Sequence, residues 1–180
     1  ADRICISLPC QPPFPAARTV LTGNPVRQEI LAAAKGERPV HEVPTLLVLG
    51  GSQGAHRVNL LMLEAAEVLV AEGRPVRIIH QTGTADEATV REGYRRIGVE
   101  AEVSAFIRDM AAVYRRADLA VSRAGATTLA ELAVMGLPAL LVPYPYAADN
   151  HQLTNGKYYE KTGGCVVVEE AGLTGEILGK

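Results

Sequence analysis

Short apolar runs alternate with helix-like stretches about six times along this chain, and no other feature limits its possible folds as strongly. Residues 45–49 read Thr-Leu-Leu-Val-Leu, a run typical of a strand that is buried on both faces. Because strands that alternate with helices pair in parallel, the pattern predicts an α/β fold, a Rossmann-like parallel sheet with helices on both faces. Further strands are expected at residues 76–80, 99–103, 119–121, 139–142 and 165–168.

Composition excludes several classes of protein. The net charge of −2 and the aromatic content of 4% argue against nucleic acid as a partner, because such surfaces need basic patches or stacking platforms. The three cysteines, Cys5, Cys10 and Cys165, show no metal-ligand spacing, and their odd number fits a reducing compartment. The uncharged stretch 132–148 contains Gly136 and three prolines, which indicates helix end, strand and loop instead of a membrane span.

The predicted strand 45–49 runs into a glycine-rich turn, residues 50–55, and a long amphipathic helix follows. A strand, a glycine turn and a helix start form a geometry in which backbone N–H groups surround phosphate. The turn matches neither the GxGxxG dinucleotide fingerprint nor the Walker P-loop, which disfavours a dehydrogenase. The Ser52 hydroxyl is a candidate donor to a phosphate oxygen, and the alternative is that Ser52 only caps the helix.

A second turn of small residues joins the predicted strand 119–121 to a helix expected over residues 128–135. Gly125 allows the backbone to approach a ligand, and the free N–H groups of the helix start point toward that ligand. Glu131, one turn into the helix, is a candidate acceptor for ribose hydroxyls. The alternative is a capping box, in which the Thr128 hydroxyl and the Glu131 carboxylate only satisfy the helix start.

Arg27 occupies an unusual position at the start of a helix. Asn24 is expected to be the N-cap and Pro25 the first helical residue, which places Arg27 in the first turn. A cation there opposes the helix dipole. Arg27 therefore either is solvated or pairs with Glu42 or another acid, or it binds an anion.

The candidate site residues all follow predicted strands. Ligands of parallel α/β sheets bind outside the carboxyl ends of the strands, so these residues are expected to gather at one edge. Two glycine-bearing turns and an arginine predict a nucleoside diphosphate site at that edge. The residues are Arg27, Ser52, Ile107, the turn 125–131 and Gln152.

Five segments, in order along the chain, resemble the MurG family, the bacterial peptidoglycan N-acetylglucosaminyltransferases. They are Thr-Gly-Asn-Pro-Val-Arg at 22–27, Gly-Gly-Ser-Gln-Gly-Ala at 50–55, Arg-Ala-Gly-Ala-Thr-Thr-Leu-Ala-Glu at 123–131, Gly-Leu-Pro-Ala at 136–139 and Asn-His-Gln at 150–152. The resemblance implies one half of a two-domain GT-B glycosyltransferase. Residues 1–18 would form an interdomain connection with a short strand, and 19–180 the UDP-sugar-binding, C-terminal domain, cut at both ends.

The resemblance also implies a reaction. N-acetylglucosamine would pass from UDP-N-acetylglucosamine, with inversion, to the 4-hydroxyl of undecaprenyl-pyrophosphoryl-N-acetylmuramoyl-pentapeptide, a step of cell-wall biogenesis on which cell shape and division depend. UDP-N-acetylglucosamine is the substrate, and no cofactor or metal is implied. The acceptor and the catalytic base would belong to a missing N-terminal domain. The protein would sit peripherally on the cytoplasmic side of the bacterial plasma membrane.

Residue roles follow from the matching motifs. Arg27 and Ser52 would contact the diphosphate, and Arg27 would also stabilise the leaving UDP. Ile107 would meet the uracil through its backbone, Glu131 would accept from the ribose, and Gln152 would bond sugar hydroxyls. The other expected donor-binding residues lie in or beside the same motifs: Ala126, Thr127, Thr128, Leu129 and Ala130, with Gly51, Gly125 and Asn155 as secondary candidates.

Two histidines receive no catalytic role. His80, at a predicted strand end, is interpreted as structural, and His151 stands where many relatives have another polar residue. Two alternative functions stay open. One is another UDP-sugar enzyme of the same architecture, a glycolipid glucosyltransferase or a UDP-N-acetylglucosamine 2-epimerase. The other is a non-catalytic UDP-sugar-binding subunit.

Overall fold

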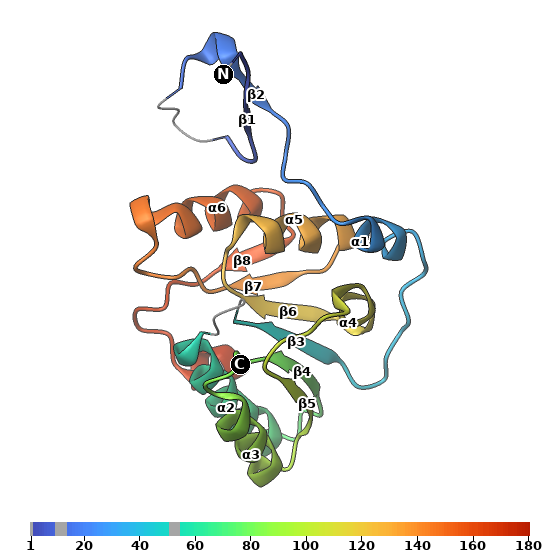
Figure 1. The fold of residues 1–180 in the computed structure, drawn as a ribbon. Helices are drawn as coiled ribbons and strands as arrows, with labels where there is room; N and C mark the ends of the chain where they lie inside the picture. The colour runs from blue at the N-terminus through green and yellow to red at the C-terminus, as the bar shows by residue number, and fades with distance from the viewer. Residues whose placement is uncertain (1, 10–13, 51–54) are drawn as a thin grey trace.

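The computed structural model describes residues 2–9, 14–50 and 55–180, and its main feature is a six-stranded sheet (Figure 1). The strands are β3 (Thr45–Leu49), β4 (Arg77–Gln81), β5 (Glu100–Ser104), β6 (Leu119–Ser122), β7 (Ala139–Leu141) and β8 (Cys165–Val167). They lie in the order β5-β4-β3-β6-β7-β8, and every neighbouring pair is parallel. The order in which the chain adds strands reverses between β3 and β6. Open parallel sheets bind ligands in the crevice at such a point, outside the carboxyl ends of the strands.

Strand β3 shows why its sequence lacks a polar side. Leu47 and Leu49 pack into the core on one face of the sheet, and Val48, between them, packs into the core on the other face. Successive side chains of a strand point to opposite faces. A strand that is covered on both faces therefore needs apolar residues at every position.

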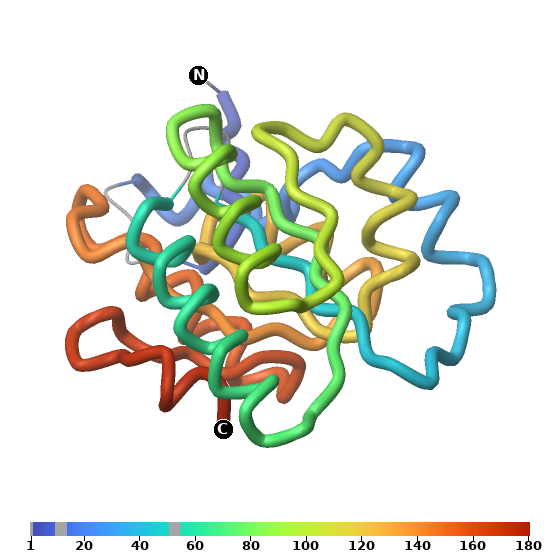
Figure 2. Tube along the Cα trace, turned by 90° about the horizontal axis from the view of Figure 1, so that it is seen from below, coloured from blue at the N-terminus to red at the C-terminus, as the bar shows by residue number. Residues whose placement is uncertain are grey.

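Helices cover both faces, as the alternation predicts. On one face lie α2 (His56–Ala71), α3 (Glu87–Ile97) and α7 (Gly175–Gly179), and Figure 2 shows α2 and α3 running side by side. On the other face lie α1 (Gln28–Ala33), α4 (Met110–Arg116), α5 (Ala126–Met135) and α6 (His151–Glu160) (Figure 1). The predicted fold class is confirmed, including the Rossmann-like parallel sheet.

The N-terminal segment forms a small sheet of its own. Strand β1 (Ile4–Ile6) pairs in parallel with β2 (Thr19–Leu21), which follows a short 3₁₀ helix, Ala16–Arg18. Neither strand joins the six-stranded sheet, and Figure 1 shows the pair beyond α5 and α6. The domain boundary at residue 19 remains a prediction, and the strand pairing places β2 with β1 instead of with the main sheet.

The start of α1 differs from the prediction. The helix begins at Gln28 with Arg27 as its N-cap, so Asn24 does not cap it and Pro25 is not its first residue. The Asn24 side chain is used elsewhere, because its oxygen accepts from Ser7 Oγ at 3.1 Å and its nitrogen donates to Thr127 Oγ1 at 3.3 Å. Asn24 therefore links the N-terminal strands to α5.

The backbone conformation of the preceding residues decides where α5 and α6 begin. Helix α5 begins at Ala126, two residues before the expected start, because Gly125 adopts the extended N-cap conformation. Helix α6 begins at His151 after a 3₁₀ turn, Ala148–Asn150, in which Asp149 and Asn150 have φ angles of 50° and 54°. Left-handed residues cannot continue a helix, so α6 begins only after Asn150.

Among the described residues there is neither a membrane-spanning helix nor a metal-binding cluster. No helix among them combines the length and the apolar character that a membrane crossing requires. Within the same residues, no group of three His, Cys, Asp or Glu side chains is arranged to hold a metal ion.

Candidate functional site

A cavity of about 370 Å³ opens at the carboxyl edge of the sheet, beside the crevice between β3 and β6. Its walls come from the ends of β3 and β4, the loop after β5, the start of α1, and helices α4 and α5. Segments far apart in the sequence therefore meet at the place that the fold predicts for a ligand. The lining residues are Arg27, Leu49, Gln81, Phe106, Ile107, Met110, Tyr114, Thr127, Thr128 and Glu131.

An ion pair between Arg27 and Glu131 forms one side of the cavity. Arg27 Nε donates to Glu131 Oε1 at 3.1 Å, and Arg27 Nη1 lies 3.5 Å from Glu29 Oε1. The Glu131 side chain is 6% exposed, whereas that of Arg27 is 44% exposed. The hydrogen bond to Glu131 raises the pKa of Arg27 above its usual value, so the guanidinium stays charged. Of the two interpretations of Arg27, pairing with an acid describes this structure, with Glu131 in place of Glu42.

Tyr114 holds the other oxygen of the same carboxylate. Its hydroxyl donates to Glu131 Oε2 at 2.9 Å, and the tyrosine is 1% exposed. Burial, together with the negative charge of Glu131, raises the pKa of Tyr114, so its hydroxyl remains a donor. Each oxygen of Glu131 thus accepts from a side chain of another helix or its cap. The capping-box interpretation is wrong, because neither oxygen bonds the start of α5.

The start of α5 faces the same cavity without a side-chain cap. Gly125 is the N-cap and makes no side-chain hydrogen bond. Thr127 and Thr128, in the first turn, line the cavity. A helix start of this kind offers N–H groups and a partial positive charge to an anion. Leu129 and Ala130 are also buried, but neither lines this cavity.

Ile107 reaches the cavity from the loop after β5. Its backbone N–H donates to Gln81 Oε1 at 2.9 Å, so that donor already has a protein partner. Gln81 ends β4 and is 6% exposed. Sequence reasoning missed Gln81 and Tyr114 as site residues. A polar residue at the carboxyl end of an apolar strand was the available signal for Gln81, but Tyr114 gave none.

Gln152 and Asn155 are not brought to the cavity. Gln152 Oε1 accepts from the backbone N–H groups of Ala124 at 3.2 Å and Tyr144 at 3.0 Å. Asn155 Nδ2 donates to the carbonyl of Ala124 at 3.3 Å. Both side chains therefore fasten the loop between β6 and α5 to α6. At the Gln152 oxygen, the predicted bonds from sugar hydroxyls would therefore compete with the two hydrogen bonds from backbone N–H groups.

Three further predictions have different outcomes. Ser52 and Gly51 lie outside the described residues, directly after the end of β3 and Gly50. His80 is fully buried and hydrogen-bonded on both ring nitrogens, in agreement with a structural role. His151 is exposed, and its Nδ1 lies 2.8 Å from the carbonyl oxygen of Ala148.

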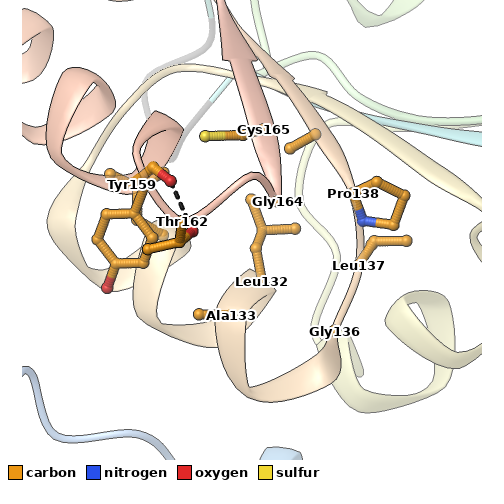
Figure 3. A pocket seen from close by; sticks show the side chains of 11 residues that line it. Leu132, Ala133, Gly136, Leu137, Pro138, Tyr159, Thr162, Gly164 and Cys165 are labelled. Atoms are coloured by element: carbon orange, nitrogen blue, oxygen red, sulfur yellow. Dashed lines mark hydrogen bonds between the residues drawn. The ribbon is translucent and has the colours of Figure 1, made fainter.

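A second cavity, of about 360 Å³, lies at the opposite edge of the sheet (Figure 3). The segments that begin β7 and β8 contribute Leu137, Pro138 and Cys165, and α5 contributes Leu132. Its lining is mostly apolar and includes only Leu129 of the predicted site residues. The first cavity, with its ion pair and helix start, is therefore the candidate site.

The fold and this cavity define a class of protein: the chain is a Rossmann-like domain of the GT-B type with a polar site at the carboxyl ends of its strands. Residues 45–180 match the glycosyltransferase family 28 C-terminal domain, and the chain belongs to that family.

Similar proteins agree with this assignment. The chain is 52% identical over 175 residues to a UDP-N-acetylglucosamine--N-acetylmuramyl-(pentapeptide) pyrophosphoryl-undecaprenol N-acetylglucosamine transferase of Desulfotalea psychrophila, covering 96% of this chain and 47% of the relative. It is 47% identical to the protein of that name in Geobacter metallireducens, covering 100% of this chain and 50% of the relative. The crystal structure of Acinetobacter baumannii MurG superposes with a TM-score of 0.79 at 32% identity, covering 99% of this chain and 50% of that one.

These matches confirm the resemblance to the MurG family. The chain spans about half the length of the curated relatives it matches.

Proposed function

We propose that this chain supplies the donor site of an inverting hexosyltransferase that acts in peptidoglycan synthesis. The enzyme transfers N-acetylglucosamine from UDP-N-acetylglucosamine to undecaprenyl-pyrophosphoryl-N-acetylmuramoyl-pentapeptide. The observation that carries the proposal is the pairing of Arg27 with Glu131 in the wall of a cavity beside the helix start of α5. The names of the relatives supply the substrates.

The pair suits a nucleoside diphosphate. Glu131 would accept hydrogen bonds from the ribose hydroxyls, because an ionised carboxylate is a strong acceptor. Arg27, with its more exposed side chain, would turn from Glu131 to the diphosphate. Its fixed positive charge would then stabilise the negative charge that develops on the leaving UDP. Ser52, Gly51 and the N–H groups at the start of α5 would complete the phosphate contacts.

The nucleobase and the sugar would use the walls of the same site. Ile107 would meet the uracil, and the Gln81 side chain that now accepts its N–H lies beside it. Gln152 and Asn155 would act on the donor sugar mainly by holding the loop around Ala124. UDP-N-acetylglucosamine is bound as substrate, and the proposal needs neither a cofactor nor a metal.

The acceptor requires a second site. Inverting transfer needs a base within hydrogen-bond distance of the acceptor hydroxyl. We place that base and the lipid-linked acceptor on the other half of the protein, which binds peripherally to the cytoplasmic face of the bacterial plasma membrane.

The test is a calorimetric titration of the full-length protein with UDP-N-acetylglucosamine, UDP-glucose and ADP, followed by transfer of labelled sugar to the lipid-linked acceptor. Binding and transfer with UDP-N-acetylglucosamine, and silence with ADP, are expected. Equal binding of ADP would contradict recognition of uracil. Transfer from UDP-glucose instead, or epimerisation without an acceptor, would identify another UDP-sugar enzyme of this fold.

A pair of variants tests the role of Glu131 in the same assay. Glu131→Gln removes the charged acceptor and is expected to weaken UDP binding by about 1–3 kcal/mol. Glu29→Gln is the matched control, since Glu29 also lies beside Arg27 but at the surface. Equal losses in the two variants would show that Glu131 acts only through its charge on Arg27.

A further inference from the structure

Tyr114 and Glu131 come from two helices that meet beside the candidate site. Tyr114, on α4, and Glu131, on α5, both line the cavity and are 1% and 4% exposed. Their side chains are joined by the 2.9 Å hydrogen bond from the tyrosine hydroxyl to Oε2. The bond is therefore shielded from water, and it lies next to the ion pair with Arg27.

The two oxygens of Glu131 have different partners. Oε2 accepts from a neutral, buried hydroxyl, whereas Oε1 accepts from Arg27, whose side chain is 44% exposed. A guanidinium commonly binds a carboxylate through two parallel hydrogen bonds, which would occupy both oxygens. Here Tyr114 takes one of them, so the arginine holds only Oε1. Oε1 is thus the oxygen whose partner can leave when a ligand draws Arg27 away.

We propose that Tyr114 is a positioning residue of the donor site, which fixes the Glu131 carboxylate so that Oε1 is presented to the ribose hydroxyls. This inference rests on the proposed function. A neutral donor orients the carboxylate without cancelling its charge, so Glu131 keeps its strength as an acceptor. The expected consequence is that Tyr114 contributes to the selectivity for ribose over sugars that lack the hydroxyls.

The test compares the affinities of the full-length protein for UDP and for 2′,3′-dideoxy-UDP, which lacks both ribose hydroxyls. The ratio of the two dissociation constants measures selectivity for the hydroxyls. The wild-type protein is expected to prefer UDP about 100-fold. Tyr114→Phe should reduce this preference about tenfold, because a misplaced Glu131 carboxylate loses one charge-assisted bond to a ribose hydroxyl. The change should come from weaker binding of UDP, with the dideoxy ligand little affected.

Tyr94→Phe is the matched control. Tyr94 is also 1% exposed, but its hydroxyl bonds His80 on the other side of the sheet. Loss of this hydroxyl should leave the selectivity ratio unchanged. An equal drop in both variants would overturn the inference, because it would reflect general loosening of the fold.

A double-mutant cycle provides a second readout. If Tyr114 acts through Glu131, Tyr114→Phe should have no further effect on selectivity in the Glu131→Gln background. The inference would be overturned if Tyr114→Phe kept the full wild-type selectivity for ribose, or if it lowered that selectivity equally in the Glu131→Gln background. Either result would leave the proposed donor site intact. Absence of ribose selectivity in the wild-type protein would overturn the proposed role of Glu131 itself.

Discussion

Two buried tyrosines lie on opposite faces of the sheet, and their hydroxyls serve different kinds of network. Tyr94, on α3, bonds His80 Nδ1 at 2.9 Å, and His80 Nε2 bonds Asn59 Oδ1 at 3.0 Å. Tyr114, on α4, bonds the Glu131 carboxylate, which Arg27 holds from the cavity side. The tyrosine, histidine and asparagine of the first network are all buried in the interior, whereas the second network ends at a cavity.

The partners of Asn59 explain how both ring nitrogens of His80 are satisfied. Its amide nitrogen donates to the carbonyl of Thr82 at 3.0 Å and to Asp86 Oδ2 at 2.7 Å. Its oxygen therefore accepts from His80 Nε2–H, and the other ring nitrogen accepts from the hydroxyl of Tyr94. Every polar atom of the imidazole is satisfied while the ring remains neutral. Burial penalises the imidazolium and lowers the pKa of His80 to about 3.

The comparison separates stability from binding. Buried neutral side chains that satisfy one another offer no free group to a ligand. The second network keeps an ionised carboxylate at a cavity wall, where one of its partners is partly exposed and can be exchanged. Disturbing the first should therefore change folding, and disturbing the second should change ligand binding.

The largest effect is expected from Asn59→Leu. The substitution keeps the approximate volume but removes one hydrogen bond each from His80, Asp86 and the carbonyl of Thr82, at a cost of about 3 kcal/mol in the free energy of unfolding. Urea denaturation measures this loss, and the affinity of the folded protein for UDP should not change. His56→Ala, at the exposed end of the same network, is the control and should cost about 0.5 kcal/mol or less. Similar costs for both variants would contradict the importance of the buried bonds.

The pH dependence of stability is the next largest effect. The folded-state pKa of His80 is about 3, below the usual histidine pKa of 6.5, so between these two pH values the unfolded chain binds a proton that the folded chain does not. The stability contributed by neutral His80 is complete above pH 6.5 and falls by up to about 1.4 kcal/mol per pH unit as the pH drops toward 3.

Denaturation of the wild-type protein and of His80→Gln between pH 7 and pH 4.5 isolates the contribution of His80 to stability. The other titratable groups are present in both proteins, so they should change the free energy of unfolding with pH by roughly the same amount in each. The difference in stability between the two proteins should narrow as the pH falls. A difference that stays constant would show that His80 is not held neutral by its burial.

Arg27→Ala probes the second network. It should weaken UDP binding by about 2 kcal/mol, because a charge-assisted contact to the diphosphate is lost, and should affect uridine far less. Calorimetry with both ligands measures the difference. If UDP and uridine lose affinity equally, Arg27 does not contact the diphosphate.

The smallest effect is expected from Asp109→Ala. Asp109 caps α4, the helix that carries Tyr114, by accepting from the N–H of Ala112 at 3.0 Å. Loss of this cap should lower the free energy of unfolding by about 1 kcal/mol without changing the preference for ribose. A loss of ribose selectivity as large as that in Tyr114→Phe would show that the helix end, not the tyrosine hydroxyl, positions Glu131.

Local patterns were sufficient for much of the site. Apolar runs placed the strands, and the rule that ligands bind at the carboxyl edge brought Arg27, Ile107 and Glu131 to one cavity. Gln152 also follows a strand, yet its oxygen binds two backbone N–H groups away from the cavity. Position along the chain gives the edge of the sheet on which a side chain lies, but not its hydrogen-bond partners.

The sequence by itself determined the fold class, because apolar periodicity and turn residues act over short distances along the chain. It also determined the family, through the five segments that resemble the MurG family. Only the tertiary structure decided that Glu131 pairs with Arg27, 104 positions away, and with Tyr114, 17 positions away. It also decided that His80 is a neutral core residue and that Thr128 and Glu131 form no capping box. The physical reason is that a buried polar group takes whichever partner the packing of distant elements brings within hydrogen-bond distance.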